Sequence, residues 1–179
     1  ILIPGENDFG TTDAVVIGGG IVGTATAFWL SRAGLDVVVV EMRDGLSTLT
    51  TPASAECFRA QFTEPAMAAL ALPSIEMFED FGEKIGIPKY SISIKQQGYL
   101  FLTDAPESVD DLKENVEQQH KLGIADSEFL ERDEILARFP FLSPSVLAAT
   151  FRQRDGWLAS HETTQGFAKG CDARFFLKT

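Results

Sequence analysis

Two apolar runs flank one helical stretch near the start of the chain. Residues 13–17 are mostly β-branched, and residues 36–41 carry four consecutive valines before Glu41. Continuous apolar runs of this kind are typical of strands buried on both faces of a parallel sheet. Between them, apolar residues recur at helical spacing over 21–33, and Gly34 follows where a helix end favours a left-handed residue. The pattern predicts a strand–helix–strand unit.

The pattern becomes less regular after this unit. Residues 44–55 are small and rich in hydroxyl groups, which predicts a loop. Glu64 and Pro65 begin a helical stretch that reaches about Gly82, with a kink or a break expected at Pro73. Further elements are predicted in this order: strand material, as a hairpin or a bulged pair, over 91–103; a solvent-facing helix over 109–123; a short helix over 131–139; a strand over 146–152; a helix from His161; and a strand over 174–179.

Composition and charge narrow the class of protein. The chain has 179 residues, 45% of them hydrophobic and 23% charged, which suffices for one domain or for one domain and part of a second. Its formal net charge of −11 repels phosphate backbones and argues against nucleic-acid binding. An anionic cofactor stays compatible with this charge, because local backbone dipoles can hold phosphate groups.

The cysteines and the apolar runs indicate in which cellular compartment the protein is expected. Cys57 and Cys171 lie far apart and form no CxxC motif, so no disulfide framework is expected and a reducing, cytoplasmic environment is favoured. No apolar run approaches the ~20 residues that span a bilayer, so no transmembrane segment is expected. Residues 1–13 lack the basic region of a signal peptide. Because residue 1 is not Met, the true start is expected to lie before it.

A glycine-rich turn joins the first strand to the helix. Gly18, Gly20 and Gly23 form GxGxxG, and Glu41 follows at close to the spacing of about 20 residues expected in dinucleotide-binding units. Gly18 permits a tight exit from the strand, Gly20 lets a pyrophosphate approach the main chain, and Gly23 lets the helix pack against the sheet. The N–H groups and the positive dipole end of the helix stabilise the phosphates.

Glu41 favours a turn that binds a dinucleotide over a glycine turn that binds no ligand. Its carboxylate is expected to accept hydrogen bonds from ribose hydroxyls, and it would repel the 2′-phosphate of NADP. The alternative is a structural glycine turn without a ligand. An NAD-dependent dehydrogenase would continue to alternate strands and helices, whereas here the hydroxyl-rich loop follows and leads to Arg59. Such a loop suits the second phosphate and part of a flavin.

Several segments resemble the D-amino-acid oxidase-like flavoproteins, the family that contains sarcosine oxidase, glycine oxidase, dimethylglycine dehydrogenase and dye-linked proline dehydrogenase. The resemblance extends from about residue 13 to 170. It is carried by "DAVVIGGGIVGTATAFWLSRAGLDVVVVE", "STLTTPASAECFRAQF", "GYLFLT", "RFPFL" and "ATFRQRDGWLASHETTQGFAKG". The first segment is common to many flavoproteins with this type of fold, and the second and the last point toward sarcosine oxidase and its close relatives.

The resemblance implies FAD as the cofactor. It places the adenosine near Glu41, with Met42 and Arg43 beside the adenine, and it places Ser47 and Thr48 at the phosphate–ribityl region. The pyrophosphate is expected at the glycine turn and the start of the helix. The implied cofactor-binding residues are Gly18, Gly20, Ile21, Val22, Gly23, Glu41, Met42, Arg43, Ser47 and Thr48.

The resemblance also implies a reaction. Members of the family oxidise a C–N bond of a small amine or amino acid such as sarcosine, glycine, proline or dimethylglycine. A hydride equivalent passes to flavin N5, the resulting imine is hydrolysed, and oxygen or another acceptor takes the electrons. Arg59 matches a region where relatives place an arginine near the flavin or the substrate carboxylate, which a guanidinium can bind through both oxygens. The alternative is that Arg59 pairs with an acid such as Glu56 or Glu64.

The expected fold class is α/β: a Rossmann-like FAD-binding strand–helix–strand unit with part of an inserted α+β substrate domain. We expect an FAD-binding portion over 1–90, part of the substrate domain over 91–155, and a return to the FAD-binding domain over 156–179. Because family members are about twice this length, the chain is expected to be a fragment or one chain of a split protein, inactive alone. Two other functions stay open: an NAD-dependent or 2-hydroxy-acid flavin dehydrogenase, and a non-catalytic nucleotide-binding subunit. Homo-oligomers and hetero-oligomers are both compatible.

Overall fold

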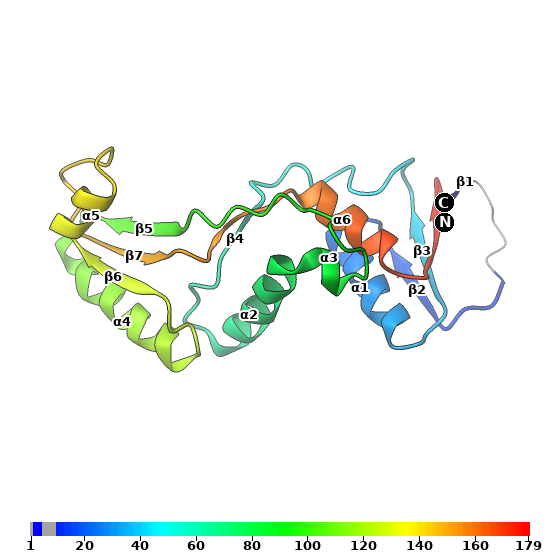
Figure 1. Cartoon of the computed structure of the whole chain (residues 1–179), viewed down its shortest axis with the longest axis horizontal. Helices are drawn as coiled ribbons and strands as arrows, with labels where there is room; N and C mark the ends of the chain where they lie inside the picture. Colours follow the sequence, from blue (N-terminus) through cyan, green and yellow to red (C-terminus); the bar gives the residue numbers. More distant parts are fainter. Residues whose placement is uncertain (1, 5–9) are drawn as a thin grey trace. The chain divides into compact units, whose positions relative to one another are not determined.

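The computed structural model describes residues 2–4 and 10–179 (Figure 1). Their contacts divide the chain into two compact units. The first unit comprises the described residues up to Glu56, together with Asp80–Ile94 and Leu158–Thr179. The second unit comprises Cys57–Glu79 and Lys95–Trp157. The sequence analysis put residues 57–79 with the first domain, whereas their contacts group them with the second unit.

The first unit contains a parallel sheet. Its strands are β1 (Leu2–Pro4), β2 (Ala14–Ile17), β3 (Val37–Glu41) and β9 (Arg174–Leu177), in the spatial order β1-β9-β3-β2. Every neighbouring pair is parallel. Val37, Val38 and Val39 are buried in β3, as expected for an inner strand of a parallel sheet. The predicted α/β class is confirmed, and the last strand does return to this sheet.

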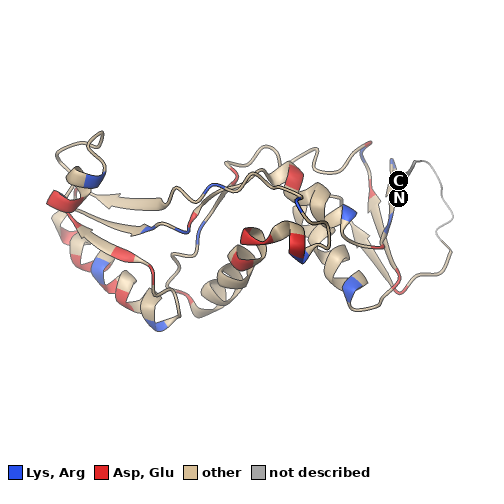
Figure 2. Ribbon diagram, in the orientation of Figure 1, with Lys and Arg blue, Asp and Glu red and all other residues tan. Residues whose placement is uncertain are grey.

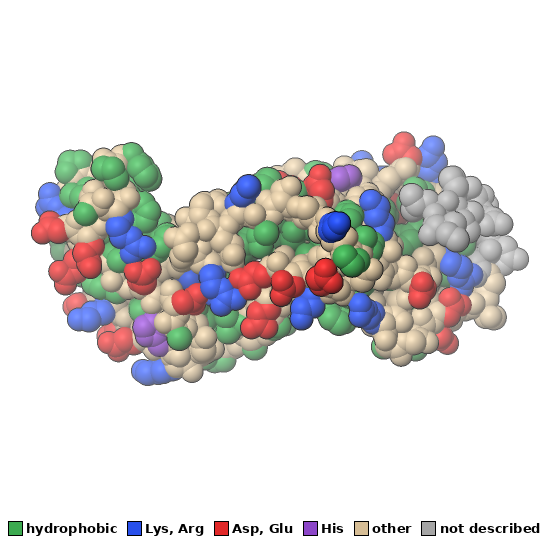
Figure 3. All heavy atoms as spheres, in the orientation of Figure 1, with side chains coloured by type: hydrophobic (Ala, Val, Ile, Leu, Met, Phe, Trp, Pro, Cys, Tyr) green, Lys and Arg blue, Asp and Glu red, His purple; other side chains and the backbone are tan. Residues whose placement is uncertain are grey.

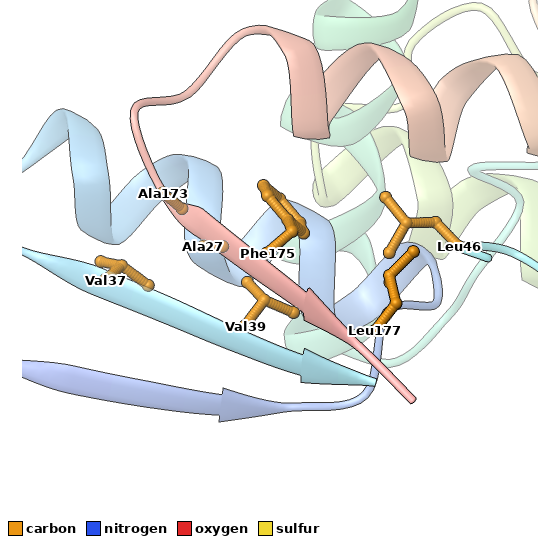
Figure 4. Packing of buried hydrophobic residues seen from close by; sticks show 7 residues of the cluster. All are labelled: Ala27, Val37, Val39, Leu46, Ala173, Phe175 and Leu177. Atoms are coloured by element: carbon orange, nitrogen blue, oxygen red, sulfur yellow. The ribbon is translucent and has the colours of Figure 1, made fainter. Parts of the chain in front are cut away.

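Three helices belong to the first unit: α1 (Ile21–Arg32), α3 (Phe81–Lys84) and α6 (Ser160–Lys169). Phe28 of α1, Phe81 of α3 and Phe167 of α6 join them, with the ring centroid of Phe167 lying 5.3 Å from that of Phe28 and 5.0 Å from that of Phe81. The core between helices and sheet is shown in Figure 4. Its buried members are Ala27, Val37, Val39, Leu46, Ala173, Phe175 and Leu177. This core anchors α1 behind the turn that follows β2.

The second unit contains two antiparallel sheets. Strands β5 (Tyr99–Thr103), β7 (Ala148–Arg152) and β6 (Glu128–Glu131) form one sheet in that order, and β4 (Cys57–Phe58) pairs with β8 (Gly156–Trp157). The helices are α2 (Pro65–Glu79), a 3₁₀ turn η1 (Pro106–Ser108), α4 (Val109–Lys121) and α5 (Arg132–Arg138).

Each face of the larger sheet carries its own helix. Ala149 and Phe151 of β7 pack with Ile135 of α5. Thr150 lies between them and therefore points to the opposite face, where α4 packs against β7.

The surface of the second unit is charged on α4 and apolar after α5. In Figure 2 the charged residues along the ribbon of α4 are mostly acidic with a few basic ones between them, as expected for the predicted solvent-facing helix. Figure 3 shows apolar side chains gathered over the segment that follows α5, where Phe141 is 82% exposed. Among the described residues, no helix is both long and apolar enough to cross a membrane.

Some predicted elements differ from the structure. Helix α2 continues through Pro73 instead of splitting there, and it ends at Glu79. The strand predicted over 91–103 begins only at Tyr99, pairs with β7, and forms no hairpin with the residues before it. Ser93 has a φ of 53°, a left-handed conformation that interrupts an extended strand. Strand β6 was not predicted, because its short segment carries one buried residue, Leu130.

Candidate functional site

The glycine turn after β2 has the tight geometry that its sequence predicts. Gly18 has a φ of 103°, which only glycine adopts without strain, and its N–H donates to the carbonyl of Val40 at 2.8 Å. A Cβ built on Gly23 would overlap the carbonyl oxygen of Gly18. The first turn of α1 therefore lies directly against the end of β2.

The N-terminus of α1 has little side-chain capping. Gly20 is the N-cap and offers no side chain, and the first turn carries no acidic residue. The N–H of Ile21 donates to the hydroxyl of Thr51 at 3.3 Å. A helix start of this kind presents N–H donors and a positive dipole end, which suit an anionic group.

Glu41 ties the end of β3 to the glycine turn. Its Oε2 accepts a hydrogen bond from the N–H of Gly19 at 2.7 Å, and its Oε1 accepts one from the N–H of Arg43 at 2.8 Å. The carboxylate is half-buried and borders a cavity of about 290 Å³. The predicted cofactor-binding residues that line this cavity are Gly18, Gly20, Glu41, Met42, Arg43, Ser47 and Thr48.

A second cavity continues along the start of α1. It measures about 590 Å³ and is bordered by Ile21, Val22 and Gly23, and also by Ser160 at the start of α6. The two cavities share Ile17, Gly18, Gly20, Thr50 and Thr51, so they form one glycine groove. All ten predicted cofactor-binding residues border this groove.

Ser47 brings to the glycine groove a buried hydroxyl that lacks a partner in the described part of the chain. The residue is 5% exposed and has a φ of 59°, and its N–H donates to the carbonyl of Gly19 at 3.1 Å. Within the described residues its Oγ has no hydrogen-bond partner. A buried hydroxyl without a partner costs about 1–3 kcal/mol, so a phosphate or hydroxyl group of a ligand would stabilise this position.

Glu56 and Ser160 were not predicted as part of the site. The carboxylate of Glu56 accepts hydrogen bonds from Ser160 at the start of α6, at 3.0 Å from its N–H and 2.5 Å from its Oγ. The hydroxyl of Ser160 also lies 3.1 Å from the carbonyl of Thr51. These contacts fix the hydroxyl-rich loop to α6. Both residues lie in segments that carried the family resemblance, which was the one available signal.

Arg59 lies in the second unit and lines a separate cavity, the arginine pocket, of about 260 Å³. Its guanidinium carbon is 4.6 Å from the ring centroid of Phe62 and 4.9 Å from that of Phe101. Two aromatic rings therefore hold the guanidinium by cation–π contacts. Glu64 lines the same pocket, but among the described residues no ion pair joins Arg59 to it.

A buried polar network supports the segment that carries Arg59. Asp155 is fully buried, and its Oδ1 accepts hydrogen bonds from the N–H of Ala60 at 2.9 Å and from Nη1 of Arg152 at 2.7 Å. Its Oδ2 accepts from Nε2 of Gln61 at 3.2 Å. Arg152 is 1% exposed and also donates to Asp126 at 2.7 Å. The two residues after Arg59 are thus fixed to the connection between β7 and β8, far along the chain.

No metal site accompanies these pockets. In the part of the chain that the structure describes, no group of three His, Cys, Asp or Glu side chains could hold a metal ion. The glycine groove offers the N-terminus of α1, and the arginine pocket offers the guanidinium of Arg59.

A family model described as FAD dependent oxidoreductase matches residues 13–178. The chain belongs to this family. Among curated proteins, FAD-dependent oxidoreductase domain-containing protein 1 of Xenopus laevis is 30% identical over 155 residues, and its Drosophila melanogaster homolog is 32% identical over 182 residues. These matches cover 81% and 94% of this chain but 31% and 34% of the relatives. The chain thus spans about a third of their length.

Other relatives of this chain carry enzyme names. Mitochondrial dimethylglycine dehydrogenase of Rattus norvegicus is 26% identical over 162 residues, which is 88% of this chain and 18% of that protein. The crystal structure of L-proline dehydrogenase from P. horikoshii matches with a TM-score of 0.81 and 33% identity, over 92% of this chain and 43% of that one. The predicted family and its cofactor, FAD, are confirmed. The orphaned hydroxyl of Ser47 and the close packing at Gly23 fit such a group.

Proposed function

We propose that this chain contributes to an enzyme that oxidises the C–N bond of a small amine or amino acid with FAD. The observation that carries the proposal is Arg59. Its guanidinium contacts the rings of Phe62 and Phe101 and borders a cavity. A guanidinium held in this way suits a carboxylate, because its planar fork can bind both oxygens. The names of two relatives support an amino-acid substrate: L-proline dehydrogenase and dimethylglycine dehydrogenase.

In this proposal the first unit holds the cofactor. The N–H groups at the start of α1 bind the pyrophosphate, Glu41 accepts hydrogen bonds from the ribose, and Ser47 and Thr48 donate to the phosphate–ribityl region. Met42 and Arg43 border the adenine. When bound, FAD accepts a hydride equivalent from the carbon beside the amine.

The second unit is, in the same proposal, part of the substrate domain. Arg59 binds the carboxylate of the substrate and orients the molecule. The carboxylate of Asp155 holds the N–H of Ala60 and the amide of Gln61, which limits the movement of Arg59. The substrate's electrons pass finally to oxygen or to another acceptor.

Anaerobic flavin reduction tests the proposal. The full-length protein is loaded with FAD and mixed with sarcosine, glycine, L-proline, dimethylglycine or the 2-hydroxy acid L-lactate, and bleaching of the flavin absorbance is followed. We expect bleaching with at least one of the amino acids, and a raised KM with little loss of kcat in Arg59→Lys. Bleaching by lactate alone would favour the 2-hydroxy-acid alternative. Flavin that binds and is reduced by none of the five compounds would favour a non-catalytic subunit.

A further inference from the structure

Besides Arg59, the arginine pocket contains a buried polar group without a partner in the part of the chain that the structure describes. Gln119, on α4, lines the pocket and is 3% exposed. Its Oε1 has no hydrogen-bond partner among the described residues. A buried amide oxygen without a donor is costly, at about the strength of one lost hydrogen bond. The terminal torsion of a glutamine side chain is broad, so the amide can turn and present its oxygen to the cavity.

The pocket's other buried polar groups are already engaged. The hydroxyl of Thr150 donates to Oε1 of Gln61 at 2.8 Å. Nε2 of Gln61 in turn donates to the carbonyl of Tyr99 at 2.9 Å and to Asp155 at 3.2 Å. Among the fully buried groups of the pocket this leaves Gln119 for a ligand, beside the donors of Arg59 and the half-buried side chains of Thr63 and Asn115. The exposed carboxylate of Glu64 at the same pocket adds a second acceptor.

We propose that the arginine pocket selects a carboxylate that also carries an N–H or O–H donor, and that Gln119 is the residue that reads this donor. Arg59 binds the carboxylate and the amide oxygen of Gln119 accepts from the donor. Amino acids with at least one hydrogen on nitrogen satisfy both groups when the amine is neutral, whereas a neutral tertiary amine leaves Gln119 unpaired. The inference rests on the proposed function for one point, that Arg59 binds a carboxylate.

The affinities of two planar acids of nearly equal shape test the inference. Pyrrole-2-carboxylate carries an N–H beside its carboxylate, and furan-2-carboxylate has an oxygen acceptor in the same place. Their dissociation constants are measured by calorimetry on the full-length protein, without turnover. We expect the pyrrole acid to bind about tenfold more tightly, because the furan acid leaves the amide oxygen unpaired. This first comparison needs no variant. Equal affinities, tighter binding of the furan acid, or binding of neither acid would overturn the inference.

Variants on α4 then test whether Gln119 causes the difference in affinity between the two acids. Gln119→Met keeps the length of the side chain and removes the acceptor, so the two acids should bind alike. Gln118→Met, at an exposed neighbouring position, is the matched control and should keep the preference. A preference that survives Gln119→Met would show that another group reads the donor. Because these measurements involve no flavin reduction, the inference can fail while the amino-acid oxidation stands, and the oxidation can fail while the preference stands.

Discussion

Replacement of Asp155 by asparagine should strongly destabilise the second unit. The carboxylate is fully buried and receives hydrogen bonds from Arg152, the N–H of Ala60 and the amide of Gln61. Asparagine preserves the shape and one acceptor oxygen, but its NH₂ group then faces the donor of Gln61. The change also removes the charge that compensates Arg152, which keeps only Asp126, whose side chain is 41% exposed.

The magnitude follows from the burial of the pair. Removing one partner of a buried ion pair costs about 3–5 kcal/mol, because the other charge stays buried. The remaining contact to Asp126 puts Asp155→Asn at the lower end, about 3 kcal/mol. Glu128→Gln is the matched control, because its pair with Arg138 has side chains that are 45% and 39% exposed. An exposed pair contributes about 0–1 kcal/mol.

Urea unfolding followed by tryptophan fluorescence measures both changes. The chain has two tryptophans, so Trp29→Phe leaves Trp157, in β8 of the second unit, as the only reporter. With a typical slope of about 2 kcal/mol per molar urea, Asp155→Asn should lower the midpoint by about 1.5 M. The control should shift it by less than about 0.5 M. Equal shifts in the two variants would refute the idea that this network supports the unit.

The double variant Arg152→Met with Asp155→Asn separates the effect of the buried charges on stability from the effect of side-chain shape. The double variant removes both buried charges while the asparagine oxygen still accepts from the N–H of Ala60. Its loss of stability should therefore be clearly smaller than the sum of the two single losses, with a coupling of about 1–3 kcal/mol. Strict additivity would mean that the two charges do not depend on each other.

Three further predictions concern other positions. The pKa of Glu79 is lowered from its ordinary value of 4.5 by the hydrogen bond from Arg154, while partial burial acts in the opposite direction. The wild type should therefore be more stable than Glu79→Gln above pH 4.5. This difference in the free energy of unfolding should disappear as the pH falls through the lowered pKa, and urea titrations at stepped pH measure it. Burial raises the pKa of Cys171 above 9.0, so at pH 8 mass spectrometry should show iodoacetamide modifying Cys57, which is exposed, well before Cys171. Gly23→Ala should abolish FAD binding in a flavin-absorbance titration, because the added Cβ meets backbone and the helix start must move.

The sequence predicted best the parts of the fold that depend on local patterns. The valines of β3 form a buried run regardless of their partners, and the strand, helix and second strand lie where the pattern put them. β6 was missed because its alternation is short and its stability comes from pairing with β7. Residues 91–98 were overpredicted, since a left-handed Ser93 cannot be read from an alternating pattern.

In the candidate site, too, local features could be predicted from the sequence and contacts between distant residues could not. The glycines could be predicted, because each has a task within one turn and the start of one helix. The network around Asp155 could not, because its hydrogen bond to Ala60 joins residues 95 positions apart. The same holds for Gln119, whose sequence context is an ordinary charged helix and whose place in the arginine pocket follows only from the packing of α4 on the face of the sheet that carries Thr150.

Glu41 supports the glycine turn and, in the proposed function, also binds the ribose of the cofactor. Its two oxygens already accept hydrogen bonds from Gly19 and Arg43. An ionised carboxylate offers about four lone-pair positions, so two remain for the ribose hydroxyls of a cofactor. In the proposed complex, binding need not release the glycine turn, because the contact between Glu41 and Gly19 can persist. A groove that keeps this contact is pre-organised for the proposed cofactor, which lowers the cost of ordering on binding.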